Sequence, residues 1–201
     1  MTNNFGIIGR IERDEDALSP REFDNVGTMY CTHPGYNLGD GDVNLPEDTN
    51  DGSYMILGLY LYDHSGLRMS ISPFSCSWDS RSVGVIYTKR GVEGLSDEDL
   101  RLRLEAEVAE YNSFLKGDAW GYVIEDAGGE VLDSCWGYTG NKEYCEKEMQ
   151  TMLASRIKLE GERIEDRNSK YSKEDWINEV WKGNTILGLE DWRQVMEESD
   201  D

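Results

Sequence analysis

The stretch from residue 54 to residue 72 constrains the fold most, because it has the pattern of a β-hairpin. Its first part, YMILGLYLY, is an apolar run rich in aromatic side chains. Its last part, LRMSIS, alternates Leu67, Met69 and Ile71 with polar residues, which is typical of a strand with one buried face. The intervening His-Ser-Gly ends in Gly66, which is free to adopt the positive φ of a tight turn. We therefore predict two antiparallel strands joined by a short loop.

Other stretches extend this sheet. The sequences VGTMYCT (26–32) and SVGVIYTK (82–89) have the composition of strands. Farther along, AWGYVIED and VLDSCWGY are joined by AGGE, which predicts a second hairpin with aromatic side chains on both strands. The sequence between 39 and 53 is an acidic loop.

A helix is predicted over residues 96–116. Ser96 and Asp99 form a start similar to a capping box, and Gly117 ends the helix. Five apolar residues recur at steps of three or four and so share one face: Leu100, Leu104, Val108, Tyr111 and Leu115.

The last third of the chain is predicted to be helical. One helix runs from about 142 to about 166 with a potential break at Gly161, a second begins at Ser172, and the segment LEDWRQVMEES forms a short third. The expected fold class is α+β, with an antiparallel sheet packed by the 96–116 helix. We expect a core domain over 1–140 and a helical C-terminal extension over 141–201.

The charge of the chain is strongly negative, with 41 acidic and 20 basic residues and a formal net charge of −21. Residues 91–201 hold 28 of the acids and 13 of the bases. Such a chain repels nucleic acids and anionic membranes and attracts cationic surfaces, so we expect a partner protein with a basic surface. The alternative is that the charge serves only solubility.

The location expected from sequence is the cytoplasm. The N-terminal sequence MTNNFGIIGRIERDED lacks the basic start and apolar run of a signal peptide, and no apolar run approaches the ~18 residues of a membrane span. Four cysteines without Cys-x-x-Cys spacing are typical of a protein with reduced thiols.

One candidate catalytic set combines Cys31 and His33 with Asp63 and His64. Residues two apart on a strand point to the same side, so the thiol and imidazole of the first pair could act as nucleophile and base in a hydrolase or transferase. Pro34 bends the chain immediately afterwards, and no known nucleophile motif surrounds any cysteine. Burial of an inert cysteine is the alternative, and we expect a binding protein rather than an enzyme.

Two metal sites are weaker candidates, and we expect no cofactor. The residue types of Cys31, His33, His64 and Cys76 suit zinc, although their spacing matches no compact zinc motif. The acidic loop matches part of a calcium-loop frame, but Leu45 occupies the position that needs glycine. The loop residues at frame positions 1, 3, 5, 9 and 12 are Asp40, Asp42, Asn44, Asp48 and Asp51. No phosphate-binding glycine motif is present.

Three motifs together resemble a family of uncharacterised acidic proteins from tailed bacteriophages and related mobile elements. They are DNVGTMYCTHPGYNLGD, LYLYDHSGLRMSISPFSCSWDS and GYVIEDAGGEVLDSCWGY, and the resemblance covers about residues 23–140. It implies a phage gene product that acts inside a bacterial cell. It implies no chemistry and assigns no catalytic residue.

Acidity and phage resemblance together predict an anti-defence inhibitor, for example of a restriction or CRISPR system. Its net charge equals that of roughly 36 Å of duplex DNA, so it could mimic nucleic acid if carboxylates from several helices gathered on one face. The candidate binding acids are Glu105, Glu107, Glu110, Glu143, Glu146, Glu148, Glu162, Glu165 and Asp166. The alternatives are the Cys/His enzyme described above and a structural or regulatory phage protein, which could form an oligomer.

Overall fold

The computed structural model describes residues 5–47, 51–76, 78 and 80–199. It contains two antiparallel sheets and four α-helices, with helices concentrated in the C-terminal part, which confirms the predicted α+β class. The chain forms two compact units. One comprises residues 1–10, 123–133 and 148–201, and the other comprises residues 11–122 and 134–147. The domain boundary near residue 140 that the sequence suggests stays a prediction.

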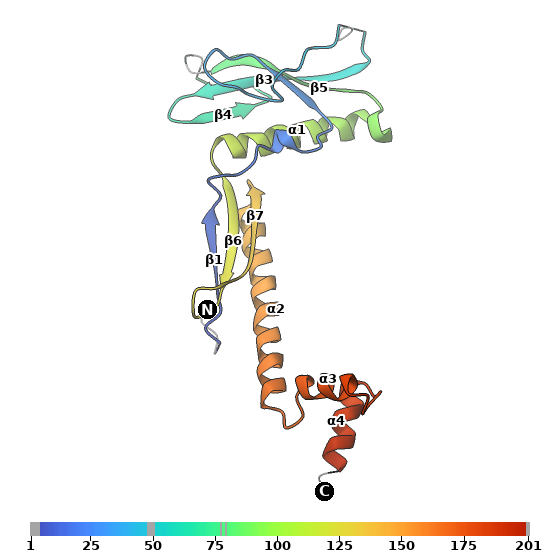
Figure 1. The fold of residues 1–201 in the computed structure, drawn as a ribbon. Coiled ribbons are helices and arrows are strands. Elements are labelled where there is room, and N and C mark those ends of the chain that lie inside the picture. The colour runs from blue at the N-terminus through green and yellow to red at the C-terminus, as the bar shows by residue number, and fades with distance from the viewer. Residues whose placement is uncertain (1–4, 48–50, 77, 79, 200–201) are drawn as a thin grey trace. The chain divides into compact units, whose positions relative to one another are not determined.

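A four-stranded sheet with the order β2-β5-β3-β4 lies in the second unit. Its strands are β2 (Thr28–Cys31), β3 (Tyr54–Asp63), β4 (Leu67–Ser70) and β5 (Ser80–Lys89). The hairpin predicted over 54–72 is therefore β3 and β4. Figure 1 shows helix α1 (Asp97–Leu115) packed along one face of this sheet.

The central pairing of β3 with β5 contains a β-bulge next to Leu59. Gly84 pairs with Leu59 on one side and with Cys31 of β2 on the other. A Cβ atom at Gly84 would lie 1.9 Å from the carbonyl oxygen of Tyr30, and its φ is +156°. Only glycine fits this close approach, so Gly84 allows three strands to pair tightly at the bulge.

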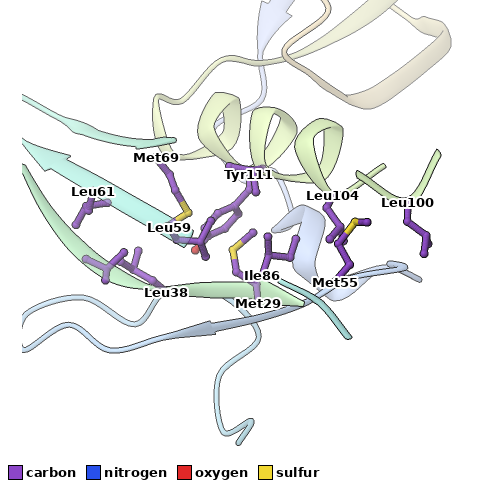
Figure 2. Close-up of a cluster of buried hydrophobic side chains, with 12 residues drawn as sticks. Met29, Leu38, Met55, Leu59, Leu61, Met69, Ile86, Leu100, Leu104 and Tyr111 are labelled. Carbon is purple, nitrogen blue, oxygen red and sulfur yellow. The ribbon is translucent and has the colours of Figure 1, made fainter. Parts of the chain in front are cut away.

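The main core lies between this sheet and α1 (Figure 2). The helix buries Leu100, Leu104, Val108 and Tyr111, which confirms four positions of the predicted apolar stripe. Met29 of β2, Leu59 of β3 and Ile86 of β5 are also fully buried and belong to the same cluster. Ser96 caps the helix as predicted, since its side chain accepts a hydrogen bond from the backbone N–H of Asp99.

The second sheet has three strands in the order β1-β6-β7. They are β1 (Ile8–Arg13), β6 (Ala119–Glu125) and β7 (Val131–Thr139). The hairpin of β6 and β7 corresponds to the predicted second hairpin, whereas the sequence of β1 carries no predicted strand. Two short 3₁₀ helices, η1 (Pro20–Glu22) and η2 (Val92–Gly94), complete the first half of the chain.

The C-terminal helices are α2 (Lys142–Asn168), α3 (Lys173–Trp181) and α4 (Leu189–Glu198). The expected break at Gly161 is absent, because α2 is continuous through it. One glycine costs a helix only about 1 kcal/mol relative to alanine, which a long helix tolerates. A complete capping box between Ser172 and Asp175 starts α3.

Candidate functional site

The thiol of Cys31 lies at the end of β2 and packs against the core cluster. Burial, with a smaller contribution from the nearby Asp40 carboxylate, raises its pKa to about 12. Because the nucleophilic form of cysteine is the thiolate, a thiol that stays protonated at neutral pH is a poor nucleophile. This environment favours a structural role for Cys31.

The other candidate catalytic residues lie in loops and at strand ends near the same sheet. His33 follows β2, stacks on Tyr36 with ring centroids 4.9 Å apart, and accepts a hydrogen bond from the backbone N–H of Gly35 at 3.2 Å. The Tyr36 hydroxyl donates to the carboxylate of Asp63 at 3.3 Å. His64 lies beyond β3, with its ring 6.2 Å from that of Tyr62. Tyr36 therefore links His33 to Asp63, and Cys31 belongs to the core instead.

The candidate metal ligands that the structure describes do not come together as a metal site. Among the residues that the structure describes, no group of three or more His, Cys, Asp and Glu side chains could hold a metal ion, and this includes the four zinc candidates. In the acidic loop, Asp40 binds Arg21, and the carboxylate of Asp51 accepts from the backbone N–H of Ser53 at 2.7 Å. Asp42 and Asn44 are exposed, and Asp48 lies outside the described residues.

Arg21 is the centre of a buried ionic cluster, although it comes from the short helix η1. Its side chain is only 3% exposed. Nε and Nη2 donate to the two carboxylate oxygens of Asp40 at 2.6 and 3.0 Å, and Nη1 donates to Glu107 of α1 at 2.9 Å. Nη2 also donates to the carbonyl oxygen of Gly27 at 2.6 Å. Burial by itself lowers the pKa of Arg21, but the hydrogen bonds to both carboxylates outweigh it and raise the pKa above its ordinary value.

Both carboxylates of the Arg21 cluster also accept backbone hydrogen bonds. Glu107 accepts from the N–H groups of Val26 at 2.8 Å and Gly27 at 3.2 Å, and Asp40 accepts from the N–H of Met29 at 2.8 Å. Burial of charge is favourable only when such partners compensate for lost hydration. The cluster therefore joins η1, the acidic loop, β2 and α1. It holds Asp40, a candidate calcium ligand, and Glu107, a candidate binding acid, inside the fold.

Half of the other eight predicted binding acids pair with bases. Four of them form ion pairs: Glu105 with Arg101, Glu146 with Lys142, Glu162 with Lys158 and Asp166 with Arg193. Glu143 and Glu165 are exposed, and Glu148 is half-buried. These pairs reduce the field that the helices present, because each carboxylate has a neighbouring cation. Glu110 is different, since it is exposed on α1 and lines a groove.

This groove is an acidic and apolar depression of about 320 Å³ in the second unit, and we name it the acidic groove. Its lining residues are Asp14, Asp16, Ala17, Leu18, Pro20, Phe23, Glu110, Trp136, Gly137 and Thr139. Three of these carry a carboxylate, and none is a lysine or arginine. The apolar lining is open to solvent, since Leu18, Phe23 and Trp136 are 60%, 62% and 44% exposed.

The walls of the acidic groove are positioned by backbone contacts. Asp14 follows β1, its N–H donates to the carbonyl oxygen of Ala119, and its carboxylate accepts from the N–H of Gly137 at 3.0 Å. The ring of Trp136 lies over Gly121 of β6, where a Cβ atom would be 2.2 Å from the indole. Glycine at this position thus leaves room for the tryptophan that forms one wall.

The acidic groove has the chemistry of a cation-binding site rather than of a catalytic one. Carboxylates attract a positively charged group, and exposed aromatic faces stabilise the same charge through their quadrupole. Of its three acids, only Glu110 is among the predicted binding acids. The missed signal was the acidic run ERDED (12–16) followed by Leu18 and Phe23, in a stretch without helical or strand periodicity.

Comparison with protein-family models, curated proteins and solved structures found no match. Within the described part of the chain, no helix combines the length and the apolar character that a bilayer crossing requires.

Proposed function

We propose that this protein is a bacteriophage accessory protein that inhibits a host defence or nucleic-acid-processing protein by binding its basic surface. Its proposed location is the cytoplasm of the infected cell. The resemblance of residues 23–140 to phage proteins supports the origin, and a net charge of −21 supports a cationic partner.

The acidic groove is the observation that carries this proposal. It brings three carboxylates together with exposed apolar side chains and no lining base. Protein interfaces combine such apolar anchors with charge complementarity, which guides association and selects the partner. The acids of the helices contribute a general negative field, whereas the groove supplies the specific contact.

A phage-protection assay tests the proposal. The chain is expressed in bacteria that each carry one restriction or CRISPR system, and a phage sensitive to that system is plated on them. We expect the chain to restore plating on at least one strain and the double variant Asp16→Asn/Glu110→Gln to lose this protection. The double variant Glu47→Gln/Glu98→Gln, which neutralises two exposed acids outside the groove, is the matched control.

Binding to the purified target then tests the electrostatic mechanism. Affinity should fall steeply as salt rises from about 50 mM to about 500 mM, because salt screens exposed charges. Protection in none of the strains, or equal protection by the groove variant, would refute the proposal.

A further inference from the structure

We propose that the acidic groove binds an arginine side chain of the partner, presented beside an apolar residue. This inference rests on the proposed function, because it names the chemical group that the same site recognises. Recognition then depends on one projecting side chain and its neighbour, and not on a carboxylate array that copies the phosphates of a duplex.

The carboxylates of the groove favour an extended organic cation over a metal ion. Asp14, Asp16 and Glu110 line one depression, yet among the described residues no three acidic, His or Cys side chains are grouped closely enough to ligate one metal. A guanidinium has five N–H donors spread over a planar fork, so it can reach separated carboxylates at the same time. An ammonium is a compact point charge and lacks this reach.

The apolar walls of the groove distinguish arginine further. Phe23 and Trp136 expose aromatic surface beside the carboxylates, and Leu18 exposes aliphatic surface. Arginine stacks its planar guanidinium on aromatic faces and covers apolar surface with its methylene groups. Charge alone can match the phosphate-binding part of a DNA-binding face, so the exposed Phe and Leu add an apolar contact that phosphate mimicry does not require.

The same unit already binds arginine side chains through carboxylates and through an aromatic ring. Arg21 donates bidentate hydrogen bonds to Asp40 and a further hydrogen bond to Glu107. Arg13 lies over the ring of Trp120, 5.0 Å from its centroid. In the acidic groove, carboxylates and an aromatic ring are present together without an arginine among the lining residues.

A peptide titration of the full chain tests this inference without the natural partner. Three end-blocked peptides are compared, each with one central residue between leucine and phenylalanine: arginine, lysine, or citrulline, which keeps the shape of arginine without its charge. Binding is followed by two-dimensional ¹H–¹⁵N NMR, with the indole N–H of Trp136 and the backbone N–H of Gly137 as reporters.

We expect the arginine peptide to shift both reporters and to bind about threefold or more tightly than the lysine peptide, because stacking on the aromatic wall favours guanidinium. The citrulline peptide should bind roughly tenfold more weakly, since charge-assisted hydrogen bonds are lost. Asp16→Asn/Glu110→Gln and Phe23→Ser should each weaken binding of the arginine peptide, and the control Glu47→Gln/Glu98→Gln, at two exposed acids outside the groove, should not. Circular dichroism of each variant checks that it is folded.

Equal affinity for the arginine and lysine peptides would overturn the inference, as would chemical-shift changes that do not include Trp136 and Gly137. The absence of any shift at about 10 mM peptide would also overturn it, because this concentration is well above the Kd expected even of such a small, weakly binding ligand. Failure of the broader proposal is distinguishable. A chain that binds the arginine peptide in the groove but protects no phage retains this inference and loses the inhibitor function. Protection that depends on the groove, without selectivity for the arginine peptide, would retain the inhibitor function and lose this inference.

Discussion

The second unit contains two acidic sites, and they differ in where their cation comes from. The Arg21 cluster encloses its own arginine between Asp40 and Glu107, with backbone N–H groups bound to both carboxylates. The acidic groove also gathers carboxylates, but its lining has no base and its aromatic walls face solvent. Similar chemistry therefore stabilises the fold in one place and leaves a binding surface in the other. Helix α1 contributes to both through Glu107 and Glu110.

The largest effect is expected from removing the enclosed cation. Arg21→Met leaves two carboxylates buried without their charged partner, which costs about 3–5 kcal/mol of the free energy of unfolding. Urea denaturation followed by tryptophan fluorescence measures this loss. Arg163→Met is the control, because Arg163 is exposed and its ion pair with the half-buried Glu160 contributes about 0–1 kcal/mol. Equal losses in both variants would show that the Arg21 cluster is energetically an ordinary surface pair.

The second-largest effect is expected from high pH, which should lower the free energy of unfolding through Cys31, beside the Arg21 cluster. Well below pH 9 the Cys31 thiol is protonated in both the folded and the unfolded state, so it adds no pH dependence there. Between pH 9 and about 12 the unfolded chain loses this proton while the folded chain keeps it. The free energy of unfolding should therefore fall across this window, by at most about 1.4 kcal/mol per pH unit from this thiol.

Stability of the Cys31→Ala variant, measured by urea denaturation at several pH values, checks this contribution. The variant starts from a lower stability because it loses packing, but its decline between pH 9 and 12 should be shallower. Burial also raises the pKa of Tyr111, so some decline remains in both proteins. Cys135→Ala changes an exposed thiol and serves as the control. Parallel pH profiles for wild type and Cys31→Ala would contradict the prediction.

A matched pair of substitutions on α1 compares the two sites directly. Glu107→Gln removes a buried charge from Arg21 and should cost about 1–3 kcal/mol of unfolding free energy. Glu110→Gln, one helical turn later, should change it by less than about 0.5 kcal/mol, as expected for a surface position. The binding assays should rank the two in the opposite order, with Glu110→Gln the more damaging per folded molecule. The same rank order in stability and binding would remove the distinction between the sites.

The smallest effect is expected at an exposed ion pair on the same helix. Glu105→Gln breaks the pair with Arg101, which is one turn away and at 2.8 Å. Such i,i+4 pairs contribute about 0.3–0.5 kcal/mol, and salt screens them. Thermal unfolding at low and high salt should show a small difference from wild type that disappears at high salt. A difference that persists would mean that this pair resembles the buried cluster more than its exposure suggests.

Local patterns were sufficient to predict the strands and helices that bury an obvious face. The alternation of Leu67 and Met69 and the apolar stripe of α1 report burial directly, because a side chain's direction repeats with the period of its element. Strand β1 has no such signal, since its sequence IGRIER mixes charged and apolar residues without alternation. Its pairing with β6 depends on residues more than a hundred positions away, which local sequence does not encode.

The candidate site was harder to predict because both acidic sites join distant segments. Arg21, Asp40 and Glu107 are far apart in sequence, and no spacing rule relates them. Nevertheless, Glu107 lies three residues after Leu104 and four before Tyr111, which places it on the buried stripe of α1. A carboxylate on that face indicates a buried cationic partner, so the position of Glu107 in the helical repeat was sufficient to predict that its side chain points into the fold. The groove walls come from the segment that follows β1, from α1 and from β7, whose association only the fold reveals.

The position of Cys135 provides a route to real-time measurement. All four cysteines lie in the described part of the chain, and Cys135 is the exposed one. It precedes Trp136 on β7, and consecutive strand residues point to opposite faces. A fluorophore attached to this thiol would thus sit behind the groove wall without obstructing the opening. Changes in its emission could report arrival and departure of a ligand on the millisecond timescale, without an enzymatic readout or a labelled partner.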